Sequence, residues 1–320
     1  MPSRSRNVRT DEIFFRVGTG AFAVVLISIV ALIGAALIKE SQLSIRQFGW
    51  SFWQTDIWDP VAGDFGARPF IWGTLYSSVL ALIISTPIAL GIAIFISELA
   101  PASMQRPLVF LTELLAAIPS IVYGLWGVFV LVPAVRQLET MTPEWLKGIP
   151  LFSGPPLGVG MLSAALILAI MVIPFSSSVA REVLKAVPQS QREGAYALGA
   201  TRWEAIRMAL FYARTGIVGA IMLGFGRALG ETMAVTMVIG NNPQISLSLF
   251  APQYTMAAVL ANEFAEATND LYLHALVEIG MVLFIMTLII NVISRMFIWS
   301  MGRQRRPRPA VAPAPAGSAA

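Results

Sequence analysis

The chain has 320 residues, of which 56% are hydrophobic and only 12% are charged, about half the charge of an ordinary soluble domain. It has no cysteine and a single histidine, His274, which excludes disulfides, thiol chemistry and a metal site built from histidines. A net charge of +4 would suggest nucleic acid in a soluble chain. Here the basic residues lie near the ends of apolar runs, which indicates membrane topology and no nucleic-acid partner.

Long apolar runs predict six membrane-spanning helices. About 20 apolar residues cross the hydrocarbon core, where the backbone must satisfy its own hydrogen bonds. The first run is longer than the core of a cleaved signal peptide, so we expect it to be retained. The predicted fold class is therefore an all-α membrane protein, a polytopic bundle of about six transmembrane helices. The predicted spans are 17–38, 71–97, 108–135, 157–179, 215–240 and 271–299.

The spans divide the chain into an N-terminus (1–16), a transmembrane domain (17–300) and a tail (301–320) that is basic and then rich in Pro and Ala. Such a composition predicts a disordered tail. Most Arg and Lys residues fall on one side of the predicted spans, which places both termini in the cytoplasm. The outer segments hold only Lys39, Arg46, Arg68, Arg136 and Lys147.

Two predicted outer loops differ in character. Loop 39–70 is rich in Trp and Phe, which is typical of an interfacial aromatic belt and also of a docking surface for an extracytoplasmic partner. Loop 241–270 has no basic residue, and its segment 256–267 is expected to form a short helix on the membrane surface. Pro87, Pro119 and Pro174 interrupt spans two, three and four, either as kinks around a pathway or as ordinary packing kinks.

The predicted cytoplasmic loop, 181–214, looks structured. Ser190 with Glu193, and Thr201 with Glu204, have the spacing of capping boxes. They predict a helix over 191–198, a stop at Gly199, and a second helix that runs into span five. The first helix has a face of small residues, which suits insertion into a groove on a partner protein. A turn that merely connects two spans remains an equal alternative.

The segment Glu193-Gly194-Ala195, followed by Leu198 and Gly199, resembles the cytoplasmic loop of binding-protein-dependent ABC importer permeases. The resemblance implies a type I importer permease fold, in which these five residues couple the chain to an ATPase subunit. The chain departs from the family pattern where Gly194 replaces an alanine and where Ala-Leu-Phe-Tyr, 209–212, replaces Ile-x-Leu-Pro.

Nucleotide hydrolysis is not expected on this chain. A phosphate-cradling loop needs Gly-Lys followed by Ser or Thr, and none of the lysines, Lys39, Lys147 and Lys185, follows a glycine. The chain is therefore predicted to be a transport subunit and not an enzyme. It is expected to carry no cofactor, with ATP-Mg bound on the partner ATPase.

Arg227 and Glu231 lie in the otherwise apolar predicted span five. Charges inside a membrane cost at least ~3 kcal/mol and usually face a partner or water. Four residues apart in one helix, they would share a face. That face continues a predicted stripe of small residues, which lets helices approach closely: Gly216, Ala220 and Gly224. One interpretation is a salt bridge that fixes helix packing. The other is an anion station, that is, a transient binding site for an anion on its way across the membrane. The planar guanidinium group can donate two parallel hydrogen bonds to phosphate oxygens. Glu278 in span six is expected at a similar depth and completes the predicted substrate pathway.

The stretch from Gly226-Arg227 to Val235 closely resembles span five of phosphate-specific ABC importer permeases. Trp58-Asp-Pro, Gly73-Thr74 and Ser97-Glu-Leu-Ala-Pro resemble the C-type permease of that system. This resemblance covers about residues 48–299. It implies a phosphate importer with a second homologous permease, a dimer of ATPase subunits and a periplasmic phosphate-binding protein, and it implies that the Arg and Glu at these positions act in transport.

Three alternatives remain open from the sequence. The chain could be a permease for another oxyanion, such as molybdate or sulfate. It could be a stand-alone secondary transporter, although no inverted repeat is visible, or a scaffold without transport. Glu98 and Glu113, near the cytoplasmic ends of spans two and three, are expected to be satisfied by water or by a loop arginine.

Overall fold

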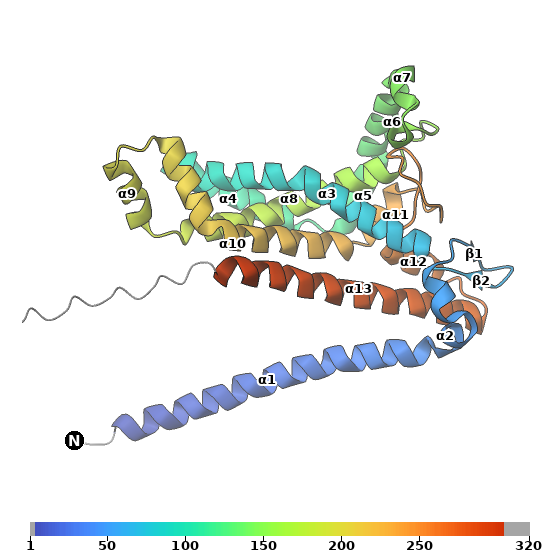
Figure 1. Cartoon of the computed structure of the whole chain (residues 1–320), viewed down its shortest axis with the longest axis horizontal. Helices are drawn as coiled ribbons and strands as arrows, with labels where there is room; N and C mark the ends of the chain where they lie inside the picture. Colours follow the sequence, from blue (N-terminus) through green and yellow to red (C-terminus); the bar gives the residue numbers. More distant parts are fainter. Residues whose placement is uncertain (1–3, 304–320) are drawn as a thin grey trace, which may run out of the picture. The chain divides into compact units, whose positions relative to one another are not determined.

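A computed structural model describes the backbone of residues 4–303 and the side chains of residues 15–301 (Figure 1). The predicted disordered tail therefore lies almost entirely outside the described residues. The described part is dominated by helices. In chain order they are α1 (Arg4–Glu40), α2 (Gln42–Phe48), α3 (Arg68–Ile94), α4 (Ala102–Ala117), α5 (Ser120–Trp126), α6 (Val132–Met141), α7 (Glu144–Lys147), α8 (Met161–Lys185), α9 (Gln189–Ala197), α10 (Arg202–Leu229), α11 (Met233–Val238), α12 (Met256–Glu263) and α13 (Asp270–Arg303).

Within residues 4–303, six helical segments are long and apolar enough to cross a membrane, which confirms the predicted number. They are Phe15–Glu40, Arg68–Leu99, Ser120–Met141, Met161–Lys185, Arg202–Leu229 and Asp270–Met301.

The third span differs from its prediction. The expected helix 108–135 is divided, because Ile118 is extended with ψ 128° and precedes Pro119. The ring of a proline disfavours helical backbone in the residue before it. Residues 102–117 form a separate helix, α4, and the third span starts only at Ser120. Pro87 and Pro174, by contrast, lie inside the continuous helices α3 and α8, so they do not divide their spans, and kinks at these two positions stay a prediction.

The fifth span also differs. Instead of one helix over 215–240, α10 ends at Leu229 and the short helix α11 follows after Gly230. Two other segments interrupt regular α-helix with π-helical turns, at Phe95–Leu99 (η2) and Gly127–Leu131 (η3). Such turns within helices often mark functional positions, and η2 carries Glu98.

The described residues form two compact units. Unit 1 takes its residues from 1–77, 120–167 and 231–286, and unit 2 from 78–119, 168–230 and 287–320. Unit 1 also contains a small antiparallel hairpin of β1 (Trp58–Asp59) and β2 (Asp64–Phe65). Asp59 closes its turn, since one carboxylate oxygen accepts the backbone N–H groups of Val61 and Ala62 at 2.9 and 3.0 Å.

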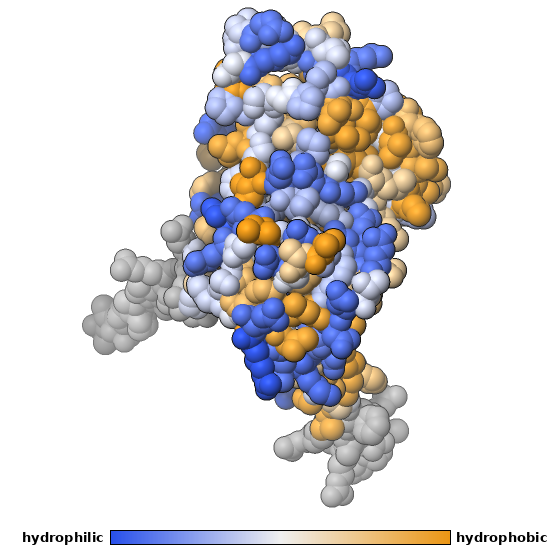
Figure 2. Space-filling view, turned by 90° about the vertical axis from the view of Figure 1, so that its right-hand side faces the viewer, coloured by the Kyte–Doolittle hydropathy of each residue, from blue (hydrophilic) through white to orange (hydrophobic). Residues whose placement is uncertain are grey.

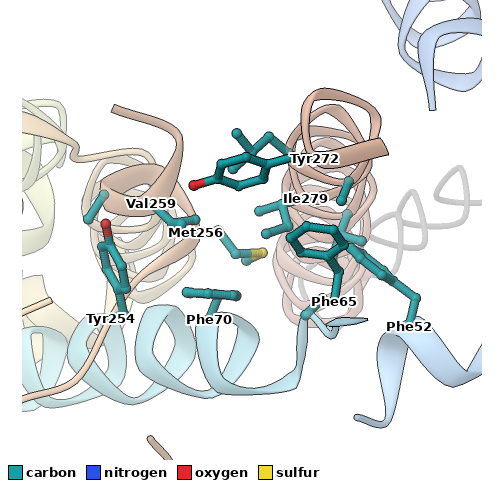
Figure 3. Close-up of a cluster of buried hydrophobic side chains, with 13 residues drawn as sticks. Phe52, Phe65, Phe70, Tyr254, Met256, Val259, Tyr272 and Ile279 are labelled. Atoms are coloured by element: carbon teal, nitrogen blue, oxygen red, sulfur yellow. The ribbon is translucent and has the colours of Figure 1, made fainter. Parts of the chain in front are cut away.

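An aromatic cluster forms the core of unit 1 (Figure 3). Phe65 stacks on Tyr272, with ring centroids 5.4 Å apart, and Trp58 meets Phe70 edge to face at 4.9 Å. Glu263 joins the cluster by accepting hydrogen bonds from the Trp58 indole at 2.8 Å and the Tyr272 hydroxyl at 2.7 Å. Much of the aromatic content of loop 39–70 therefore packs inside the protein and forms no lipid-facing belt.

Helix α12 corrects another expectation. Its residues Met256, Ala257, Ala258 and Val259 are buried, so the helix predicted to lie on the membrane surface is part of the core. The first residue of α12 is held in the interior, because the Thr74 hydroxyl in α3 accepts a hydrogen bond from the Met256 N–H at 2.9 Å.

The core of unit 2 is built on small residues of α10 that face α8. A Cβ added at Gly216 would come within 2.5 Å of Val183, and one at Gly224 within 2.3 Å of Ser176. Ala220, between them, is buried. Small side chains allow two membrane helices to approach closely, so the predicted stripe of small residues on span five is confirmed as a packing face.

Candidate functional site

The predicted cytoplasmic loop folds as helix, glycine turn and helix, as the sequence indicates. Helix α9 ends at Ala197, and Gly199 follows with a φ of +82°. The Gly199 N–H bonds to the Tyr196 carbonyl at 2.9 Å, and the Ala200 N–H bonds to the Ala195 carbonyl at 3.1 Å. This pair of bonds requires left-handed backbone at the central position, which glycine adopts without a Cβ penalty. The turn is therefore determined by residues that are neighbours in the sequence.

The two predicted capping boxes have different outcomes. Thr201 and Glu204 form the complete box at the start of α10. Ser190 and Glu193 do not, because α9 starts two residues earlier than predicted, at Gln189, with Pro188 before it and no side-chain cap. A proline at this place supplies suitable backbone geometry and has no N–H to satisfy.

Arg192 anchors α9 to the rest of unit 2. Its guanidinium donates to both carboxylate oxygens of Glu98, at 2.6 and 3.2 Å. The same group donates to the carbonyls of Leu184 and Val187, at 2.9 and 2.7 Å, where α8 ends. Arg202 adds a bond of 2.7 Å to the backbone carbonyl of Glu98. One side chain thus holds α9 against two helix ends.

The sequence anticipated half of this arrangement. Glu98 and Glu113 were expected to be satisfied by water or by a loop arginine, and they form ion pairs with Arg192 and Arg181. The bidentate geometry and the two carbonyl contacts of Arg192 were missed. The pairing with Glu98 spans 94 residues, beyond any spacing rule. The carbonyls of Leu184 and Val187 lie eight and five residues away, outside the three- or four-residue spacing of neighbours on a helix.

The residues predicted to couple to an ATPase lie together on α9 and its turn. Ala195 is buried, whereas Glu193, Gly194, Leu198 and Gly199 are exposed. Leu198 is 91% exposed, so it presents an apolar side chain at the end of the helix. A helix that is fixed on one side and presents an exposed apolar residue on the other suits docking to a partner protein.

Arg227 lies two residues before the end of α10 and is exposed. Its guanidinium lies 5.8 Å from the centre of the Phe175 ring on α8, a cation–π distance. Among the described residues of unit 2, no carboxylate forms an ion pair with it. Its N–H donors are therefore not consumed by an anionic side chain of this unit.

Glu231 has a different environment from the predicted one. The prediction that it shares a helix face with Arg227 was wrong, because α10 ends before it. Its carboxylate instead accepts the Ala234 N–H at 3.5 Å, at the start of α11. The first N–H groups of a helix lack partners within the helix, and a side-chain oxygen just ahead can accept from them. The physical reason for the change is therefore a new helix start.

Glu278 is deeply buried in α13, with 1% of its surface exposed. One of its carboxylate oxygens has no hydrogen-bond partner among the described residues. Glu231 belongs to the same unit, and no hydrogen bond joins the two within the part of the chain that the structure describes. Their shared place in a substrate pathway therefore stays a prediction.

Unit 1 also exposes apolar side chains on its loops and on α6 and α7. Figure 2 views the side on which these elements lie and shows hydrophobic patches among hydrophilic residues. The most exposed apolar side chains of these segments are Trp50, Val61, Met141 and Trp145. Tyr254 lies beneath in the aromatic core, where burial raises the pKa of its hydroxyl.

Comparison with known proteins shows which family this chain resembles. The family of binding-protein-dependent transport system inner membrane components matches residues 89–301. A chain from an inward-facing structure of the MetNI methionine ABC transporter aligns with a TM-score of 0.55 and 16% identity, over 72% of this chain and 94% of that chain, which supports the fold alone.

Two curated relatives extend over nearly the whole chain. A phosphate transport system permease protein PstC from Mesorhizobium japonicum is 45% identical over 92% of each chain. Its counterpart from Pasteurella multocida is 47% identical over 90% of this chain and 91% of that one.

Together with these relatives, the six candidate membrane spans identify a multi-pass inner-membrane permease, which is a transport subunit. More specifically, the chain belongs to the binding-protein-dependent transport system inner membrane component family of ABC importers.

Proposed function

We propose that this chain is a transmembrane permease subunit of an ATP-driven phosphate importer. The observation that carries the proposal is the identity of 45–47% with PstC proteins over at least nine-tenths of this chain. A likeness of this extent covers the anchored α9 helix and the α10 segment with Arg227 alike. The alternatives of a molybdate or sulfate permease and of a stand-alone secondary transporter have no comparable support.

In this proposal α9 transmits the motion of a separate ATPase dimer to the spans. ATP-Mg binds on that dimer, and this chain needs no cofactor of its own. Two features support the assignment. Arg192 fixes α9 to η2 and to the end of α8, so a push on α9 reaches both, and Leu198 is free to enter a partner's groove. Both termini are then cytoplasmic, as the distribution of basic residues predicts.

Arg227 is proposed as the station for the passing anion, with Glu231 and Glu278 as modulators of the pathway. An exposed guanidinium without a carboxylate partner in its own unit can offer its planar fork to phosphate. Transport requires binding that is favourable but escapable, and a nearby acidic group weakens the binding of an anion. The pathway is completed by a second homologous permease, and substrate arrives on a periplasmic phosphate-binding protein.

Uptake of radiolabelled phosphate by cells that carry Arg227→Gln tests the station. We expect uptake to fall at least about tenfold at equal protein level, since one charge-assisted contact is lost. Arg207→Gln, an exposed arginine of the same helix, is the matched control and should retain uptake. Normal uptake by Arg227→Gln would remove this residue from the pathway. Uptake of labelled molybdate or sulfate that excess phosphate does not inhibit would favour the other oxyanions.

Co-purification with the ATPase subunit tests the coupling role of α9. Ala195 is buried under the helix, so Ala195→Leu should displace α9 and abolish association. Ala186→Leu, at an exposed position after α8, is the control. Association that survives Ala195→Leu, or phosphate transport by this chain alone in liposomes, would contradict the proposed coupling.

A further inference from the structure

A pocket on unit 2 lies between α4 and α8, and its lining includes neither a residue of α9 nor Arg227. We name it the α4–α8 pocket. Its volume is about 370 Å³, within the range of roughly 300–1,000 Å³ that small-molecule sites occupy. Its lining residues are Gln105, Arg106, Val109, Phe110 and Glu113 from α4, with Arg181 and Lys185 from α8.

Helical periodicity explains why these residues meet. Arg106, Val109 or Phe110, and Glu113 recur every three or four positions, so they lie on one face of α4. Arg181 and Lys185 are four apart and share a face of α8. An ion pair of 3.6 Å between Arg181 and Glu113 joins the two faces. Three cationic side chains therefore converge on one pocket.

Arg181 is the buried member of the group. Its side chain is only 6% exposed, and one guanidinium nitrogen pairs with Glu182 at 2.7 Å. Its Nε atom has no hydrogen-bond partner among the described residues. A buried donor without a partner costs about 1–3 kcal/mol, so the arrangement favours a ligand that supplies an acceptor.

Arg106 and Lys185 are exposed, and neither forms an ion pair with any residue that the structure describes. The lining therefore holds three cations against the single carboxylate of Glu113. Even when Glu182 is counted, the surroundings of the pocket remain positive. Like charges held close together without an anion repel one another, which is a second reason to expect an anionic occupant.

We propose that the α4–α8 pocket binds a phosphate group. Guanidinium and ammonium groups on two sides match the several acceptor oxygens of a phosphate, as Arg and Lys do in many phosphate sites. The site involves no residue of the proposed transport pathway, so it stands whether or not the proposed function is correct. The phosphate group comes from inorganic phosphate or from the head group of an anionic lipid. Basic pockets between helices near the membrane surface bind such head groups, and Val109 and Phe110 offer apolar contact for an acyl chain.

The test measures binding to the purified full-length chain in detergent. Inorganic phosphate is titrated by calorimetry in an Arg227→Gln background, so that the proposed pathway residue does not contribute. Phosphatidylglycerol and phosphatidylcholine are compared by native mass spectrometry. The variants are Arg106→Gln/Lys185→Gln, which removes two cations, and Glu113→Gln, which removes the lining carboxylate. The control, Arg207→Gln/Arg46→Gln, lowers the net charge equally at exposed positions outside the pocket.

We expect Arg106→Gln/Lys185→Gln to weaken binding about tenfold or more and Glu113→Gln to tighten it, with the control unchanged. These shifts with inorganic phosphate identify the free ion as the ligand. The same shifts for phosphatidylglycerol, but not for inorganic phosphate, identify the lipid head group. If neither ligand responds differently in the pocket variants and in the control, the proposal is overturned. The opposite signs expected for the two pocket variants exclude general misfolding as an explanation.

Discussion

Arg192→Gln should release α9 from its anchor while the spans stay folded. The substitution leaves the carboxylate of Glu98, whose side chain is only 10% exposed, without its cation. It also removes the bonds to the carbonyls of Leu184 and Val187. The affected contacts all converge on one helix of nine residues, so the loss should be confined to it.

The expected loss of stability in α9 follows from the burial of the Arg192–Glu98 ion pair. Removing one partner of a fully buried ion pair costs about 3–5 kcal/mol. The Arg192 side chain is 21% exposed, and water reaching it offsets part of that cost. We therefore expect the free energy of opening α9 to fall by about 2–3 kcal/mol. Amide hydrogens of α9 should then exchange about 30- to 150-fold faster, because each 1.4 kcal/mol is a factor of ten.

Hydrogen–deuterium exchange read by mass spectrometry on the purified chain measures this directly. Arg207→Gln, an exposed arginine of α10, is the matched control and should leave α9 protected. The double variant Arg192→Gln/Glu98→Gln should exchange more slowly than Arg192→Gln alone, since no charge is left unpaired. Unchanged exchange in residues 189–197, or equal exchange in the single and double variants, would refute the anchoring argument.

Two further predictions concern packing. Gly224→Ala should destabilise the protein by about 1–3 kcal/mol and so lower its thermal unfolding midpoint, because the new Cβ would meet Ser176 at 2.3 Å. The control Gly226→Ala has open space around its Cβ and should leave the midpoint unchanged. Glu263→Gln weakens two hydrogen bonds in the aromatic core. It should destabilise the protein by about 1–3 kcal/mol and change its tryptophan fluorescence. Glu266 is exposed, so the control Glu266→Gln should leave both the stability and the fluorescence unchanged.

The helix–turn–helix loop illustrates what local sequence information can specify. Gly199 and the Thr201/Glu204 box act through hydrogen bonds within a few residues, and the structure has both. The helix breaks at Pro119 and Gly230 were harder to place. A proline or glycine permits an interruption, but neighbouring helices decide whether it occurs, as the uninterrupted helix through Pro87 shows.

The sequence by itself determined the six spans, the glycine turn and the small-residue face of α10, because apolar length, helical period and side-chain volume are local properties. Only the tertiary structure decided that Arg192 pairs with Glu98 and that α12 is buried. It also decided that three cationic residues line one pocket: Arg106, Arg181 and Lys185. Each of these depends on which helix faces meet in space. Pairing across nearly a hundred residues, as for Arg192 and Glu98, leaves no periodic pattern in the chain from which it could be predicted.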